Sequence, residues 1–272
     1  MKEKFAYFKI RFNEQIQYKA SAFAGIMTQF AFGAMYLMIY STFMKNGNTD
    51  MTISQMSAYI WLGQAFLELL QTWNIEKDIF DQIRTGNIVM DLVKPSNIYN
   101  MWYYKSLGRK LARLILRMVP LLIITALPIW GEYRFMIQTN PRLLILSIIS
   151  LFFTLLLNMS YIMLIYAFSM IFISSLSIRQ VMRILLEIGS GLLIPLPFMP
   201  DWVISILKCT PFYYFQNISF SIYIGYMTNP KEIAINLIMQ VIWVIALTFV
   251  GKAIVKNRLT KLVVQGGWNG II

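Results

Sequence analysis

The sequence predicts an all-α membrane protein, a polytopic bundle of six transmembrane helices. Composition is the first reason: 58% of the 272 residues are hydrophobic and 13% are charged, whereas a soluble domain carries charge on about a quarter of its residues. So few charges cannot cover a surface that faces water. The second reason is that six long apolar segments follow one another, with basic residues beside them. Backbone groups find no water in lipid, so each segment is expected to be helical.

The six apolar segments each approach the roughly 20 residues that an α-helix needs to cross a hydrocarbon layer. They cover residues 22–44, 53–73, 111–130, 143–175, 181–197 and 233–255. The fourth segment is longer than one crossing requires, because a helix of that length reaches about 50 Å. We therefore expect it to tilt, or to leave the membrane on the cytoplasmic side before Ser174. The sequence has no repeat, low-complexity region or linker, so residues 1–272 are expected to form one domain.

The distribution of lysine and arginine predicts the orientation. With the N-terminus in the cytoplasm, 18 of the 24 basic residues fall on the cytoplasmic side and five on the outer side, while Arg117 lies within the third span. Basic residues favour the cytoplasmic side, so both termini are expected to be cytoplasmic. The net charge of +12 is spread over the ends of the spans, which argues against a nucleic-acid partner. The basic first 19 residues also lack the pattern of a cleaved signal peptide.

The chain offers few of the groups that catalysis requires. It has no histidine, the commonest general base and metal ligand. Its single cysteine, Cys209, excludes an internal disulfide and a cysteine-rich metal site. Neither the phosphate loop of ATPases nor the nucleophile elbow of hydrolases occurs in the sequence. We therefore expect no catalytic residues, no metal site and no cofactor in this chain.

The N-terminal segment, residues 1–19, has an amphipathic pattern. Phe5, Phe8, Phe12 and Ile16 fall on one face of a helix, while polar residues occupy the others. Such a stripe is typical of a helix that lies in the membrane interface and contacts lipid. The alternative is a simple cytoplasmic extension of the first span.

The largest predicted cytoplasmic segment, residues 74–110, begins with a short amphipathic helix. Ile75, Ile79 and Ile83 recur every four residues among charges of both signs. Gly86 follows where a left-handed C-cap would end the helix. Exposed apolar residues and charges on a compact cytoplasmic segment suggest a docking surface for another protein. The alternative is a loop that only connects two spans.

The segment between the fifth and sixth spans, residues 195–231, is apolar but repeatedly interrupted. Its helix-breaking residues are Pro195, Pro197, Pro200 and Pro211. Asp201 is expected to cap a short helix over 202–208, and an aromatic run begins at Phe212. This pattern favours a re-entrant hairpin that dips into the outer leaflet; an outer loop with an aromatic anchor is the alternative.

Polar side chains inside the spans need an explanation, because a charged group costs about 2.5 kcal/mol or more at the membrane centre. Gln64, Glu68 and Gln71 fall on one face of the predicted second helix. They are candidates for lining a pathway or a dimer seam, or for structural hydrogen bonds. In the fifth span, Arg183 and Glu187 are one turn apart and are expected to form an ion pair.

The cytoplasmic segment also carries a family pattern. Asp78, the run IRTGNI from Ile83 and the run DLVKPSN from Asp91 together resemble the cytoplasmic loop of ABC-2 type permeases, the transmembrane subunits of ATP-binding-cassette exporters. The order of elements along nearly the whole chain is similar as well. The similarity is greatest to the bacterial branch in which permease and ATPase are separate polypeptides.

The resemblance implies partners and roles. The loop after the second span would be a coupling helix seated in a groove of a cytoplasmic ABC ATPase, which would bind ATP and Mg. The residues implied in coupling are Asp78, Ile79, Arg84, Gly86, Asp91 and Pro95. The re-entrant segment would close the outer end of the path, with Pro195, Pro197, Pro200 and Phe212 as the outer gate. A second permease, identical or paralogous, would complete the path in the bacterial cell membrane.

The leading prediction is therefore a permease subunit of an ABC exporter for a hydrophobic or amphipathic substrate. A drug, an antimicrobial peptide and a lipid-like molecule all remain open. An ion-coupled secondary transporter that uses Glu68 is the first alternative. A membrane-embedded lipid-modifying enzyme is less favoured, because no nucleophile–base pair or metal cluster is evident in the sequence.

Overall fold

The computed structural model describes residues 2–45, 51–72, 75–88, 91, 97–172 and 174–260, and the regular elements in these ranges are all helical. This confirms the predicted all-α class. The elements of the first half are α1 (Lys2–Ile16), α2 (Lys19–Lys45), α3 (Ile53–Ala65), α4 (Leu67–Leu70), α5 (Lys77–Thr85) and α7 (Ile98–Thr125). Those that follow are η1 (Pro128–Tyr133), α8 (Pro141–Ser169), α9 (Ser175–Gly189), η2 (Leu196–Phe198), α10 (Asp201–Lys208), η3 (Phe212–Tyr214), α11 (Asn217–Tyr223) and α12 (Pro230–Leu259).

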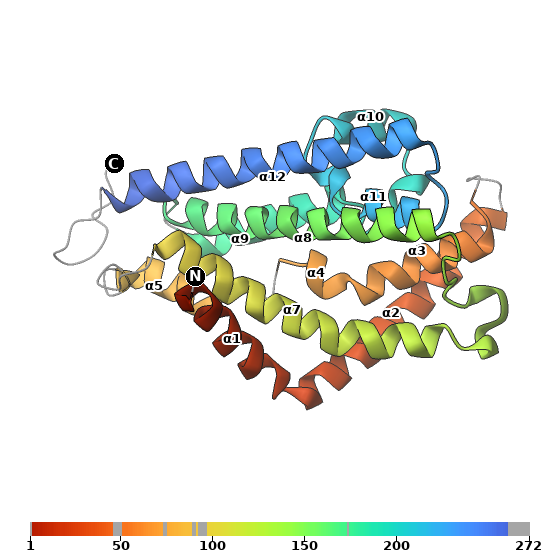
Figure 1. Ribbon diagram of the computed structural model, residues 1–272, viewed down its shortest axis with the longest axis horizontal. Coiled ribbons are helices and arrows are strands. Elements are labelled where there is room, and N and C mark those ends of the chain that lie inside the picture. Colours follow the sequence, from red (N-terminus) through yellow and green to blue (C-terminus); the bar gives the residue numbers. More distant parts are fainter. Residues whose placement is uncertain are drawn as a thin grey trace.

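The long helices run between the same two ends of the molecule. At the left-hand end of Figure 1 lie the N-terminus, α5, the start of α7 and the end of α12, while α10 and α11 lie towards the other end. Parts of the segments that were predicted to be cytoplasmic, namely the N-terminus, α5 and the end of α12, therefore lie towards the same end (Figure 1). The core follows α8, which packs against α9, α11 and α12. The second half of α8 is almost completely buried, whereas much of its first half faces outward.

Three described helices are long and apolar enough to cross a membrane by themselves: α2, over Lys19–Met44, α8 and α12. The long fourth run is divided, since α8 ends at Ser169 and Ser174 caps α9; whether the chain leaves the membrane there stays a prediction. The prediction of one continuous second helix is wrong, because the chain breaks at Phe66 between α3 and α4. The other two predicted spans also differ, since α7 starts well before the apolar run and α9 has 15 residues.

Helix α1 crosses the outside of α7 at a point of close contact (Figure 1). A Cβ atom added at Gly108 would overlap the carbonyl oxygen of Phe8, so only glycine lets the two backbones approach this closely. Phe8 stacks between Phe5 and Phe12 on α1, and Phe5 remains largely exposed. The predicted helix and its aromatic stripe are thus present, with Phe5 turned outward. Its place in the membrane interface remains a prediction.

We expect Gly108→Ala to detach α1 from α7 and to lower the free energy of unfolding by about 1–3 kcal/mol. The new methyl group meets backbone atoms of Phe8, which cannot move aside as a flexible side chain can. Thermal unfolding of the purified protein and protease cleavage within α1 measure the effect. Gly63→Ala in α3 is the matched control, because nothing lies within 4 Å of its added Cβ. Equal behaviour of the two variants would contradict the close crossing.

The segment after α9 forms short helices at the end of the molecule opposite α5. Helix α10 begins at Asp201 itself, with Pro200 at the cap position and no side-chain cap. The predicted capping role of Asp201 is therefore wrong. The proline supplies the extended backbone that precedes the helix. The carboxylate of Asp201 lies in the first turn, where its negative charge interacts favourably with the helix dipole. Helix α10 has no buried residue, whereas α11 is mostly buried.

Candidate functional site

Helix α4 ends before the second predicted span does, and a lysine from α7 binds the carbonyl groups that this helix end leaves free. Helix α4 ends at Leu70, and Gln71 has extended backbone. The buried Nζ of Lys110 donates to the carbonyl oxygens of Glu68, Leu69 and Gln71 at 3.1, 2.8 and 2.9 Å. An ammonium group has three N–H donors, so the three carbonyls match it completely.

The remaining carbonyl at this helix end belongs to Leu70, and it accepts a hydrogen bond from Asn158 Nδ2 of α8 at 2.8 Å. Asn158 and Lys110 are both buried. In a membrane interior no water replaces such donors, so the two side chains allow α4 to end at this position. Sequence reasoning missed both roles. The only signals in the sequence were Asn158, an amide within the fourth apolar segment, and Lys110, which directly precedes the third apolar segment.

Glu68 is only 2% exposed, and it forms an ion pair with Arg117 of α7. Arg117 passes over α2 at Gly25, where a Cβ atom would overlap the guanidinium group. Its NH2 group also donates to the carbonyl of Ser21 at 3.5 Å. We call Glu68, Lys110, Arg117 and Asn158 the polar seam. This pairing supports the structural interpretation of Glu68 that the sequence left open.

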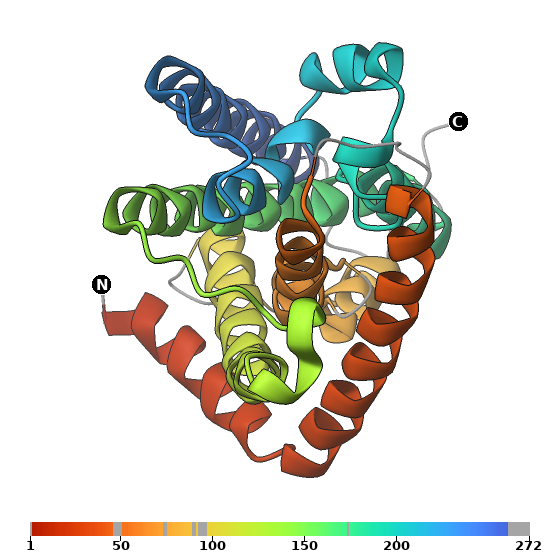
Figure 2. The ribbon, with the colours of Figure 1, turned by 90° about the vertical axis from the view of Figure 1, so that its right-hand side faces the viewer.

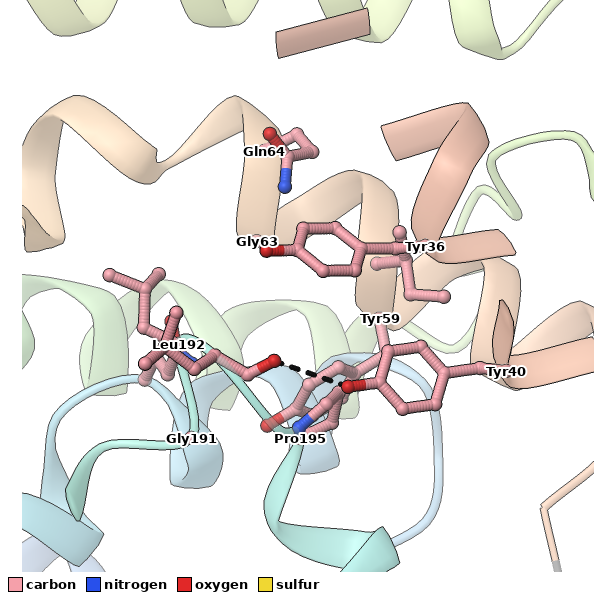
Figure 3. Close-up of a pocket in the computed structure, with 11 residues that line it drawn as sticks. Tyr36, Tyr40, Tyr59, Gly63, Gln64, Gly191, Leu192 and Pro195 are labelled. Atoms are coloured by element: carbon pink, nitrogen blue, oxygen red, sulfur yellow. Dashed lines mark hydrogen bonds between the residues drawn. The ribbon is translucent and has the colours of Figure 1, made fainter. Parts of the chain in front are cut away.

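The break in the helix separates the three polar residues that were predicted to share one face. Glu68 and Gln71 contribute to the polar seam, whereas Gln64 lines a different pocket between α2, α3 and the chain that follows α9 (Figure 3). The other polar or small residues around this pocket are Tyr36, Tyr40, Tyr59, Gly63, Gly191 and Gln216. Pro195 also lines it, so the structure joins one predicted pathway residue to one predicted gate residue.

The pocket is too narrow for a substrate in this conformation, and we call it the closed pocket. It offers about 30 Å³ of space to a water molecule, which is room for one or two waters only. Tyr40 Oη donates to the carbonyl of Leu193 at 3.1 Å and ties α2 to the loop, as the dashed line in Figure 3 shows. The side-chain carbonyl oxygens of Gln64 and Gln216 are buried and have no hydrogen-bond partner among the described residues. Such groups normally find a donor, so a water molecule or a ligand is needed here.

The other predicted gate residues lie near this pocket without lining it. Pro197 is within η2, and Pro200 precedes α10. Phe212 packs against α9 at Gly189. A Cβ atom added at Gly189 would lie 2.8 Å from the Cβ atom of Phe212. Its ring also lies 5.8 Å from that of Tyr161, edge to face. Phe212 therefore holds the chain that follows α10 against α8 and α9.

At the end of the molecule that carries α5, a group of charged side chains joins α1, α5 and α7. Glu76 at the start of α5 is fully buried, with Arg109 Nε at 2.9 Å and Arg11 NH2 at 3.6 Å from its carboxylate oxygens. Arg11 also pairs with Asp78. We call Arg11, Glu76, Asp78 and Arg109 the charged clasp. The backbone N–H of Glu76 donates to Tyr166 Oη at 3.1 Å, which adds α8 to the connection.

The two carboxylates of the charged clasp have pKa values displaced in opposite directions. Burial raises the pKa of Glu76 to about 7, with Arg109 opposing the rise and Asp78 adding to it. Burial also acts to raise the pKa of Asp78, but its hydrogen bond with Glu76 and the charge of Arg11 bring it below the ordinary value. Neighbouring carboxylates whose pKa values are pushed apart in this way share their protons unequally. Asp78 is therefore the ionised member of the pair.

Helix α5 is the predicted coupling helix, and its apolar face is buried within this chain. Ile79 is 0% exposed, and Phe80 packs against Tyr166 of α8 with ring centroids 5.2 Å apart. The expectation that these apolar residues are exposed for a partner is wrong, because α8 supplies the surface that covers them. What α5 presents outward is charged: Asp81 and Arg84 are 66% and 70% exposed.

The remaining predicted coupling residues have different positions. Gly86 ends α5 in a left-handed conformation with φ of 75°, as predicted. Asp78 is partly exposed and held by Arg11, whereas Asp91 is buried. Pro95 lies outside the described residues. The predicted ion pair of α9 is present, with Arg183 Nε 3.5 Å from Glu187 Oε1.

Comparison with known proteins identifies the family. No curated protein and no solved structure matched the chain significantly. A family model described as "ABC-2 family transporter protein" matches residues 20–266, which include the polar seam, helix α5 and the closed pocket. The match agrees with the all-helical fold and with apolar helices suited to a membrane. The chain therefore belongs to the ABC-2 transporter family of membrane proteins.

Proposed function

We propose that this protein is the permease subunit of an ABC exporter in a bacterial cell membrane, with both termini in the cytoplasm. The observation that carries the proposal is helix α5, an outward charged face mounted rigidly on the helical bundle. Cytoplasmic ABC ATPase subunits would dock on this face and supply ATP hydrolysis. Residues Asp81 and Arg84 are the exposed charges available to them.

The attachment of α5 explains how movement would pass into the membrane. Its apolar face packs on α8, and the charged clasp joins it to α1 and α7. Buried packing of this kind moves as a unit, so a push on α5 displaces the helices behind it. Alternating access by rigid-body shifts of two such subunits is the expected result.

The pathway proposal rests on the closed pocket. It has room for water only, so a substrate requires an opening movement of the loop that follows α9. Separation of Tyr40 from Leu193 would free this loop. The walls are largely apolar, with Gln64 and Gln216 as unpartnered acceptors. These features favour a hydrophobic or amphipathic substrate with a hydrogen-bond donor, and a second permease, identical or paralogous, would complete the path.

The ion pair of Glu68 weighs against the ion-coupled alternative. A proton or cation site at Glu68 requires a carboxylate that is free to exchange its partner. Arg117 already neutralises this carboxylate in the buried seam, so the pair favours a structural role.

The test of the proposal is Gly86→Val in complexes that contain the ATPase subunits. A valine at φ of 75° is strained, so the end of α5 should shift and substrate-stimulated ATP hydrolysis should fall about tenfold or more. Proteoliposomes with purified complex provide the measurement. Gly225→Val is the matched control, because Gly225 has a similar φ of 72°. It directly follows α11, which lies towards the opposite end of the molecule from α5 (Figure 1). Normal stimulated hydrolysis in Gly86→Val, or failure of any ATPase to co-purify, would refute the proposal.

A further inference from the structure

A basic pocket lies at the corner where α1 ends and α2 begins, against the side of α7. Figures 1 and 2 show α1 and α2 meeting at this corner beside α7. The pocket has a volume of about 250 Å³. The polar residues that line it are Glu14, Gln15, Tyr18, Ser21, Arg109, Arg113 and Arg117.

The three arginines recur every four residues, so they stand on one face of α7. They extend over about 12 Å of helix length. Arg109 and Arg117 have carboxylate partners in Glu76 and Glu68. Arg113 has none within 4 Å among the described residues, and only its Nε is engaged, by Gln15 Oε1 at 2.7 Å. Its two terminal amino groups remain available to an acceptor in the pocket.

The carboxylate of Glu14, which also lines the pocket, does not pair with Arg113. Glu14 accepts a hydrogen bond from Arg11 NH1 at 2.8 Å, so its charge is already compensated. Because Arg109 and Arg117 are paired, the attraction of an anion rests on the partly buried guanidinium group of Arg113, which has no ion-pair partner within 4 Å among the described residues. A phosphate group suits such a site, because guanidinium forks bind phosphate oxygens in pairs.

The position of the pocket indicates the source of the phosphate. The chain turns here from the amphipathic α1 into α2, the first helix suited to a membrane. Tyr18 is 59% exposed, and Phe23 one turn into α2 points outward as well. A lipid bound at this corner would place its head group among the arginines and its acyl chains along α2. Basic pockets between helices on the cytoplasmic side are known to hold anionic head groups.

We propose that this pocket binds the phosphate of an anionic phospholipid, with Arg113 as the principal contact. The lipid would join α1, α2 and α7 at the corner beside the charged clasp. This inference goes beyond the transport function and holds whichever substrate is carried.

The test measures lipid retention by the purified full-length protein. Delipidated protein in detergent is incubated with phosphatidylglycerol, phosphatidylcholine or inorganic phosphate, and bound lipid is counted by native mass spectrometry. We expect about fivefold stronger retention of phosphatidylglycerol than of phosphatidylcholine. Arg113→Gln should abolish this preference. Lys9→Gln removes the same charge from an exposed site on α1 and should leave the preference unchanged.

Two further arms separate the possible outcomes. Arg113→Lys keeps the charge but loses the planar fork, so it should retain a reduced preference even where Arg113→Gln fails to fold. The proposal would be overturned if Arg113→Gln kept the preference for phosphatidylglycerol over phosphatidylcholine. It would also be overturned if Arg113→Gln and Lys9→Gln lost this preference to the same extent. Displacement of phosphatidylglycerol by inorganic phosphate at the same concentration would show a free-anion site and would also overturn it.

Discussion

Replacing Arg117 with leucine is expected to lower the free energy of unfolding by about 3–5 kcal/mol. The physical reason is that Glu68, which is 2% exposed, then keeps a buried charge with no ion-pair partner among the described residues. Burial of an unpaired charge costs far more than the pair contributes. Chemical unfolding of the purified protein in detergent measures the loss. Arg134→Leu, an exposed arginine after η1, should change stability by less than about 0.5 kcal/mol.

The double variant Glu68→Leu with Arg117→Leu separates a structural pair from a functional carboxylate. Removing both charges relieves the burial penalty, so stability should return to within about 1 kcal/mol of the wild type. If Glu68 serves only in the structure, the double variant also retains transport. A stable double variant that has lost transport would contradict the structural assignment and would revive the ion-coupled alternative.

Lys110→Met is expected to cost about 3 kcal/mol. The variant preserves the length of the side chain but leaves the carbonyl groups of Glu68, Leu69 and Gln71 without their donor. Each unsatisfied buried acceptor costs about 1–3 kcal/mol, and removal of a buried charge offsets part of the sum. Hydrogen exchange at residues 67–72 should become faster in the variant, because the loss of stability begins at the end of α4.

The control for this prediction lies on the same helix. Lys105 is over the ring of Tyr7 at 6.0 Å, so Lys105→Met should cost about 1 kcal/mol or less. Lys110→Arg should be intermediate, because a planar guanidinium group cannot direct three donors to one point as an ammonium group does. A loss in Lys110→Met no larger than that in Lys105→Met would contradict the capping role.

Helix α5 shows how local and distant information differ. The spacing of Ile75, Ile79 and Ile83 and the position of Gly86 predicted the helix and its end, because amphipathic periodicity and a left-handed glycine act within a few residues. The direction of its apolar face was predicted wrongly. That direction depends on Tyr166 and its neighbours in α8, about 90 residues away in the chain.

The same distinction holds for the membrane-spanning region. Long apolar runs alone predicted a helical membrane protein, since a run of such length has no other stable state in lipid. They did not predict the break at Phe66 or the end of α4 at Leu70, because no proline or other strong helix breaker marks either position. The end of α4 is stable only with donors from other helices.

The sequence by itself determined the helical class, the presence of apolar helices suited to a membrane, the end of α5 at Gly86 and the family resemblance, all of which depend on short-range periodicity, hydrophobic length and a contiguous motif. The tertiary structure alone decided that Glu68 is paired, that its helix is broken and that Gln64 faces a closed pocket. The donors concerned, Lys110, Arg117 and Asn158, are 42, 49 and 88 residues away from their acceptors in α4. Contacts over such separations depend on how the helices pack, which no local pattern encodes.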